Sequence, residues 1–175
     1  MQILWLATFL FALSSQATMG IVHDIPTMTR NSGVVIQAKV ISQKVEQEPG
    51  GRIVTLTTLQ VKDGMKGAKT GQEITLYQVG GEYRGRVMRL QGASVYKLGE
   101  EVMLFGVPYR DQIVSYGLGL GKFNIIKDQN EIRVTEDIHD IEVATRKSGR
   151  QFFMQAQPRE YKSLKAFKEE IRKAL

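Results

Sequence analysis

The stretch GVVIQAKVISQKVEQEPGGRIVTLTTLQVK, residues 33–62, sets the fold class of the chain. In its first half apolar residues recur at every second position, which is the period of a half-buried β-strand. Pro49 and the two glycines after it predict a turn, so the two halves form a hairpin. In residues 52–62, rich in β-branched side chains, the apolar positions shift from even to odd numbers. A β-bulge near Thr57 and Thr58 would explain this shift.

Further short strands are expected after this hairpin, separated by turns and without helices between them. They are predicted at residues 73–79, 101–107, 112–120, 122–126 and 131–134. Strands at this spacing indicate a mainly β fold, a closed or nearly closed antiparallel β-barrel or a β-sandwich, within residues 33–135. The longest irregular element is the glycine-rich connection at residues 80–99.

Both ends of the chain are expected to differ from this β-barrel domain. In residues 1–17 an apolar run precedes Ser15 and Ala17, which is typical of a signal peptide cleaved after Ala17. A buried strand or an uncleaved anchor is the alternative. Residues 18–32 are expected to form a lead-in segment, and residues 136–162 a charged connection.

A C-terminal amphipathic helix is predicted at residues 163–175. Ser163 is a good N-cap, and apolar residues follow it at helical spacing while lysines and glutamates face away. We expect the apolar side to pack on the barrel, with attachment to a membrane surface as the alternative. The recurring apolar residues are Leu164, Phe167, Ile171 and Leu175.

Composition excludes several kinds of functional site. The 175 residues include no cysteine and two histidines, which rules out disulfides, thiolate zinc sites and cysteine nucleophiles. Lysine and arginine number 24 against 18 acidic residues, so the net charge is +6. No charged residue lies in residues 1–17, so the exported remainder would keep the whole of this charge.

Two segments resemble catalytic or ligand sites at first. Residues 116–123, YGLGLGKF, have the wrong glycine spacing for a phosphate loop, and glycines at a tight bend explain them better. On a strand, Asp137 and His139 would face one side, and Asp140 and Glu142 the other, so no face collects a metal or general-base set. We therefore expect a protein that is not an enzyme and that uses no metal or cofactor.

The most distinctive surface feature lies in the connection at residues 80–99. If the chain there is extended, Arg84 and Arg86 project on the same side, where their guanidinium groups suit carboxylates or phosphates. The alternative is a solvated loop whose arginines pair with Glu82, with Glu100 or with no carboxylate. The predicted binding residues are Tyr83, Arg84, Arg86 and Arg89.

An ordered set of glycines and neighbouring residues runs through residues 34–126. Its pieces include GRI at residues 51–53, KG at 66–67, VGG at 79–81, GEEV at 99–102 and GKF at 121–123. This set resembles an uncharacterised family of exported bacterial β-domains. The resemblance implies a small OB-like barrel or a related β-fold, and it implies no catalytic residues.

Together these features predict an exported protein, periplasmic or secreted, with no transmembrane span after cleavage. Its basic loops are expected to recognise an acidic envelope component or an exported protein. An inhibitor or accessory subunit of an exported hydrolase, acting through a shape-complementary loop, is the alternative. A hydrolase using residues 137–140 is a third hypothesis, and nucleic-acid binding is disfavoured by export.

Overall fold

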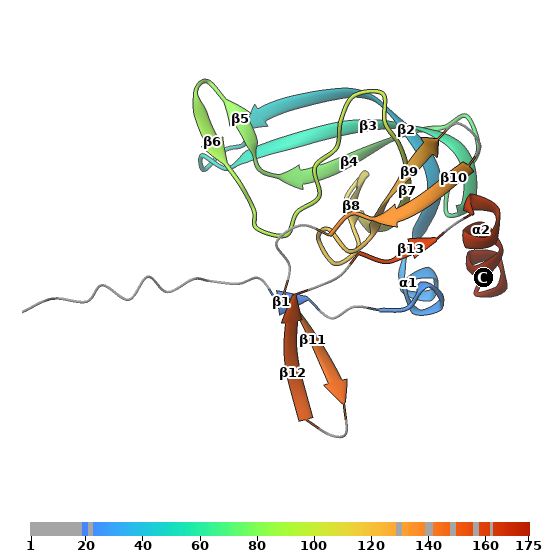
Figure 1. Cartoon of the computed structure of the whole chain (residues 1–175). Coiled ribbons are helices and arrows are strands. Elements are labelled where there is room, and N and C mark those ends of the chain that lie inside the picture. The colour runs from blue at the N-terminus through green and yellow to red at the C-terminus, as the bar shows by residue number, and fades with distance from the viewer. Residues whose placement is uncertain are drawn as a thin grey trace, which may run out of the picture.

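The computed structural model describes residues 19–20, 23–128, 131–138, 142–147, 150–155, 158–161 and 163–175 (Figure 1). Predicted features in residues 1–17, and His139 and Asp140, lie outside the described residues. In chain order the elements are β1 (Met19–Gly20), α1 (Ile25–Asn31), β2 (Val34–Gln47), β3 (Ile53–Lys66), β4 (Glu73–Val79), β5 (Gly81–Tyr83), β6 (Arg86–Met88), β7 (Glu101–Tyr109), β8 (Gln112–Ser115), β9 (Lys122–Asp128), β10 (Glu131–Glu136), β11 (Glu142–Lys147), β12 (Arg150–Gln155), β13 (Glu160–Tyr161) and α2 (Leu164–Lys173).

The main sheet has eight strands in the order β13-β10-β9-β7-β2-β3-β4-β8. Strand β8 pairs both with β7, antiparallel, and with β4, in parallel at Leu76 and Ile113. Strands β2, β3, β4, β8 and β7 therefore follow one another around a partial ring. The mainly β class and the C-terminal helix are confirmed, whereas the purely antiparallel sheet is corrected to a mixed one.

Strands β2 and β3 form the long hairpin expected from the sequence, and their pairing shifts register at three places, one of them opposite Thr58. The register passes from Val40 opposite Leu59 to Ser42 opposite Thr58, so the extra residue is Ile41 on β2. On its other side β3 pairs with β4 without a shift, and Thr57 faces Leu76. Thr57 is fully buried, so a threonine occupies an inward position of β3.

Both faces of β2 are buried, each in a different hydrophobic core. Ile36 belongs to the core inside the ring, while its neighbour Val35 belongs to a second core outside it. Successive side chains of a strand point to opposite faces, which explains the run of buried residues at the start of β2. The second core includes Phe105, Phe123 and Phe167, with the rings of Phe123 and Phe167 4.9 Å apart.

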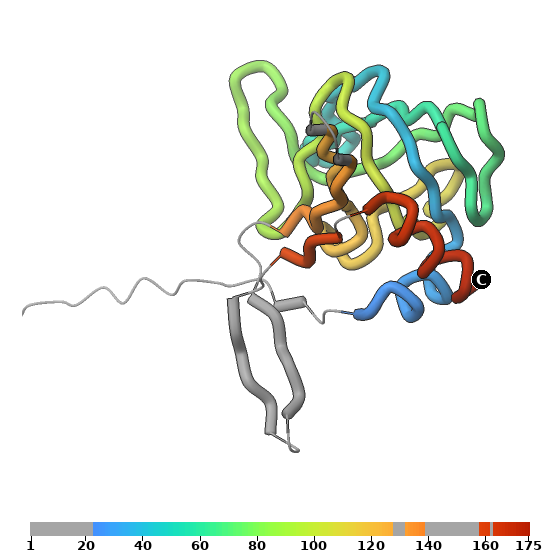
Figure 2. The backbone as a smooth tube through the Cα atoms, turned by 45° about the vertical axis from the view of Figure 1, so that its right-hand side comes forward, coloured from blue at the N-terminus to red at the C-terminus, as the bar shows by residue number. Residues whose placement is uncertain are grey.

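The two helices lie side by side over this second core (Figure 2). Helix α1 lies within the segment predicted as a lead-in, and it begins at Asp24, whose side chain accepts a hydrogen bond from the Thr27 amide. Ser163 caps α2 as predicted. Phe167 and Ile171 of α2 are fully buried, so the apolar side of this helix packs against the sheet.

Two predicted irregular regions contain additional strands. Within the connection at residues 80–99, β5 and β6 form a small antiparallel hairpin. Within residues 136–162, β11 and β12 form another, and β1 pairs with β11 in parallel.

Candidate functional site

The predicted arginines lie on the β5–β6 hairpin. Tyr83 pairs with Arg86 across the hairpin, and the two residues between them, Arg84 and Gly85, have positive φ angles of 50° and 76°. Such a pair is the backbone of a tight two-residue turn. The chain is therefore not extended between Arg84 and Arg86, so the condition under which they were expected to project on the same side is not met.

These arginines present their charge to solvent. Arg84, Arg86 and Arg89 are exposed, and the described part of the chain places no carboxylate within ion-pair distance of them. The Arg84 guanidinium lies 5.3 Å from the centre of the Tyr83 ring. The alternative pairing with Glu100 is not formed, because that carboxylate contacts Lys122 instead.

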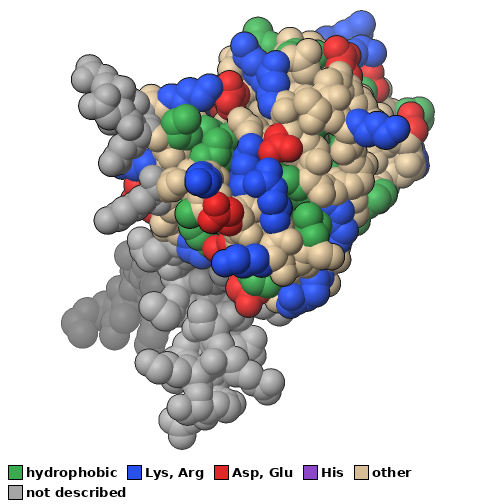
Figure 3. All heavy atoms as spheres, turned by 90° about the vertical axis from the view of Figure 1, so that its right-hand side faces the viewer, with side chains coloured by type: hydrophobic (Ala, Val, Ile, Leu, Met, Phe, Trp, Pro, Cys, Tyr) green, Lys and Arg blue, Asp and Glu red, His purple; other side chains and the backbone are tan. Residues whose placement is uncertain are grey.

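Some lysines and arginines elsewhere on the surface have acidic neighbours, whereas others, such as Lys165 and Lys173 of α2, have no ion-pair partner among the described residues. On the side that carries α2, basic and acidic side chains are interspersed (Figure 3). Lys168 of α2, for example, lies 2.8 Å from the Asp63 carboxylate. On the hairpin, by contrast, none of the three exposed arginines has such a partner among the described residues.

A groove with a volume of about 560 Å³ lies between the hairpin, the rest of the connection and the sheet. Of the four predicted residues, Arg89 lines this groove, whereas Tyr83, Arg84 and Arg86 do not. The structure thus separates the predicted site into a charged hairpin end and a neighbouring groove. The groove is lined by Gln43, Thr55, 78–82 and 87–96.

The floor of the groove is a polar continuation of the inner face of the ring. Thr55 and Thr57 lie on the same face of β3, and Gln78 is paired with Thr55 while Gln43 is paired with Thr57. Thr57 is buried beside the apolar core, and Thr55 already lines the groove. The shift in pattern seen in the sequence therefore marks where the inner face changes from apolar to polar.

Side chains of the groove floor form hydrogen bonds that link the connection to the sheet. The amide nitrogen of Gln43 donates to the Tyr96 carbonyl at 3.1 Å, and that of Gln78 donates to the Ser94 carbonyl at 2.9 Å. The Thr55 hydroxyl donates to the Gly80 carbonyl at 2.7 Å. These bonds hold the two sides of the groove at a fixed separation.

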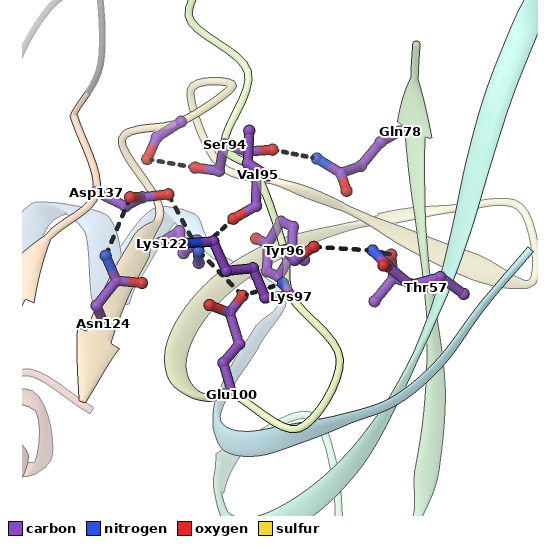
Figure 4. A network of polar contacts seen from close by, with 12 residues as sticks. Thr57, Gln78, Ser94, Val95, Tyr96, Lys97, Glu100, Lys122, Asn124 and Asp137 are labelled. Carbon is purple, nitrogen blue, oxygen red and sulfur yellow. Dashed lines mark hydrogen bonds and ion pairs between the residues drawn. The ribbon is translucent and has the colours of Figure 1, made fainter. Parts of the chain in front are cut away.

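A buried lysine holds the other side of the connection (Figure 4). The Lys122 ammonium donates to the Val95 carbonyl and lies 3.1 Å from one oxygen of Glu100 and 3.1 Å from one of Asp137. It also lies 4.7 Å from the centre of the Tyr96 ring. Burial raises the pKa of Tyr96 above its ordinary range, so its hydroxyl stays protonated.

The glycines of residues 116–123 allow close backbone contacts around this lysine. A Cβ atom on Gly119 would lie 2.5 Å from the Gly92 carbonyl oxygen, and one on Gly121 would lie 2.6 Å from that of Phe105. The Ser94 hydroxyl donates to the Gly119 carbonyl at 3.2 Å. These glycines therefore have a structural role, because a residue with a Cβ atom would obstruct these close contacts.

Of the acidic cluster at residues 137–142, the structure describes the surroundings of Asp137. Asp137 is buried, accepts a hydrogen bond from Asn124 and is paired with Lys122. Glu142 begins β11, and its side chain is outside the described residues. Among the described residues there is no group of three histidine or acidic side chains that could hold a metal ion.

No motif in the sequence indicated that Lys122 would be buried and paired with Glu100. Lys122 opens a short β-strand pattern, where a lysine is ordinarily a solvated residue. Its burial depends on Glu100 and Asp137, which lie 22 and 15 positions away in the chain. They come together because β9 pairs with β7, which follows Glu100, and with β10, which precedes Asp137.

Comparison with protein-family models, with curated proteins and with solved structures found no match to this chain. The resemblance to a family of exported β-domains therefore stays a prediction. Among the residues that the structure describes, neither helix has the length and apolarity needed to cross a membrane.

Proposed function

We propose that this protein is an exported, non-enzymatic binding module that holds an acidic partner through its basic connection. The observation that carries the proposal is the β5–β6 hairpin, where Arg84 and Arg86 are exposed without an ion-pair partner in the described chain. A guanidinium group can bond a carboxylate or phosphate through two parallel hydrogen bonds. The partner is an acidic component of the cell envelope or an acidic exported protein.

The scaffold of this module is, in our proposal, an OB-like barrel. Support comes from the five neighbouring strands β2, β3, β4, β8 and β7 and from the parallel contact that links β8 to β4. OB barrels are small five-stranded folds that bind ligands through faces and loops. Here the connection between β4 and β7 supplies the binding loop, fixed to the sheet by Gln43, Gln78 and Lys122.

Export rests on residues 1–17, proposed to be a signal peptide cleaved after Ala17. Their apolar run and small residues support this assignment, and the net charge of +6 would remain on the exported chain. In the periplasm or the medium, such a charge favours encounter with acidic surfaces.

Co-sedimentation of the purified protein with isolated bacterial cell envelopes tests the proposal. We expect binding at low salt that falls strongly at high salt, because exposed charges are screened. Replacing Arg84 and Arg86 by alanine should remove most of the salt-dependent binding. Unchanged binding and an unchanged salt dependence in this double variant would show that the hairpin is not the site.

A second candidate is an inhibitor or accessory subunit of an exported hydrolase. It is favoured by the exposed aliphatic side chains of the connection, since Val95 is 62% exposed and Leu98 is 70% exposed. Clustered exposed apolar residues commonly mark protein contacts. In this case binding to the hydrolase would persist at high salt.

A further inference from the structure

The floor of the groove displays hydrogen-bond acceptors that the described chain does not use. The Gln43 amide group donates to Thr57 and to the Tyr96 carbonyl, and the Gln78 amide group donates to the Ser94 carbonyl. A side-chain amide also carries an oxygen that accepts. Within the described residues, the Oε1 atoms of Gln43 and Gln78 accept no hydrogen bond.

Thr55 adds a third acceptor to the floor. Its hydroxyl hydrogen is used in the bond to the Gly80 carbonyl, which leaves its oxygen lone pairs to accept. Thr55 is paired with Gln78 in neighbouring strands, so these two acceptors are adjacent. A ligand that matches this floor must therefore supply N–H or O–H donors.

The rim of the groove is apolar and nearly neutral, whereas the adjoining hairpin end is basic. Val87, Leu90 and Val95 line the groove with exposed fractions of 58%, 42% and 62%. The charged residues of the lining are Glu82 and Arg89, which balance each other. The surplus of positive charge belongs to Arg84 and Arg86, just outside the groove.

We infer that the groove binds an extended peptide segment of an exported partner, uncharged where it lies in the groove and acidic where it passes the hairpin end. Its backbone N–H groups face Gln43, Thr55 and Gln78, and its side chains contact the aliphatic rim. Its carboxylates meet Arg84 and Arg86, so this inference rests on the proposed function and adds the chemical class of the partner.

A peptide fits the lining better than a saccharide does. Sugar rings also supply donors, but an exposed aromatic face is the usual surface on which a sugar or another ring stacks. The aromatic residue of the lining is Tyr96, which is 4% exposed and has the Lys122 ammonium over its ring. The aliphatic rim instead matches the side chains of a peptide.

A library of displayed random 12-residue peptides, selected on the immobilised protein, tests this inference. We expect enrichment of peptides in which an uncharged stretch adjoins aspartate or glutamate. The affinity of a labelled enriched peptide is then measured for the wild type and variants. The double variant Val87→Ser/Leu90→Ser should bind about tenfold more weakly, and Leu98→Ser, an exposed aliphatic change outside the groove, should bind like the wild type.

Removing single hydrogen-bond donors from the peptide tests the contribution of the groove floor directly. Methylating single backbone nitrogens in the uncharged stretch should weaken binding about tenfold at the positions that face the floor, as loss of one hydrogen bond does. The inference is overturned if no peptide is enriched. It is also overturned if the affinity of an enriched peptide changes neither with Val87→Ser/Leu90→Ser nor with N-methylation.

The outcomes separate the groove from the hairpin. If Arg84→Ala/Arg86→Ala weakens envelope binding while no peptide is enriched, the proposed function stands and the peptide groove is wrong. If enriched peptides lack acidic residues and depend on Val87 and Leu90 alone, the groove stands and the acidic partner is wrong.

Discussion

The Nζ atom of Lys122 lies 3.1 Å from the Oδ2 atom of Asp137, where the two side chains are 2% and 4% exposed. A buried charge is costly unless it is paired and hydrogen bonded. Lys122 meets this condition through two carboxylates and the Val95 carbonyl. Lys122 thus joins β9 to the connection through Val95 and to the segment after β10 through Asp137.

Replacing Lys122 by methionine keeps the length of the side chain but removes the ammonium group that lies beside Asp137 and Glu100. We expect the free energy of unfolding to fall by about 3 kcal/mol or more, as when one member of a buried ion pair is removed. Urea denaturation measures this loss. Lys127→Met is the matched control, because Lys127 lies on the same strand in an exposed pair with Glu101 and should cost less than about 1 kcal/mol. Equal losses in the two variants would contradict the role given to Lys122.

Gly119→Ala should disturb the close contact between Gly119 and the connection at Gly92. The new Cβ atom would lie 2.5 Å from the Gly92 carbonyl oxygen, a backbone atom that cannot rotate away. We expect a loss of about 1–3 kcal/mol, as for other overpacked sites, together with faster proteolysis within residues 90–99. Gly71→Ala is the control: it has a φ of 85° but no atom within 4 Å, so it should lower stability without speeding cleavage of the connection.

Arg159→Lys should loosen the contact between β10 and the segment before α1. Arg159 holds both oxygens of Glu136, at 2.8 Å and 2.6 Å, and donates to the His23 carbonyl at 2.8 Å. Lysine keeps the charge but cannot reproduce this fork, so we expect a loss of about 1–2 kcal/mol. Hydrogen exchange should also become faster in α1. Arg52→Lys, in an exposed pair with Glu48, should be nearly neutral, and protection of α1 unchanged by Arg159→Lys would contradict the assignment.

Glu101 should contribute stability that disappears in acid. A hydrogen bond from Lys127 is the main cause that lowers the pKa of the Glu101 carboxyl from its ordinary value near 4.5. A lowered folded-state pKa gives stability that is present above the ordinary value and is lost as pH falls through the folded value. The unfolding free energy of the wild type should exceed that of Glu101→Gln by about 0.5 kcal/mol at neutral pH, as for other surface pairs. The gap should close in acid, and a gap independent of pH would exclude this cause.

The sequence predicted much of the β-domain because its signals are local. Alternation in residues 34–40, the turn after Pro49 and the Ser163 cap each depend on neighbours in the chain, and each predicted the right element. The α1 helix was missed although Asp24 and Pro26 are an ordinary helix start. A bulge near Thr58 was predicted, but alternation on one strand cannot show that the extra residue there, Ile41, belongs to its partner.

The site was predictable only in part. The arginines of the connection stood out by type and spacing, but the two-residue turn at Arg84 and Gly85 was missed although it is a local feature of the chain. The groove depends on Gln43, Thr55 and Gln78, which come from three strands and have no motif in common. The sheet register alone places them together.

The most direct test of the account is the binding of a charge-reversed hairpin to isolated cell envelopes at low salt. Arg84→Glu/Arg86→Glu is compared with Lys165→Glu/Lys173→Glu, which makes the same change in net charge at exposed positions of α2. We predict that the hairpin variant loses at least tenfold in affinity while the helix variant loses much less. Equal losses in the two variants, or full binding by the hairpin variant, would contradict the claim that the hairpin holds an acidic partner.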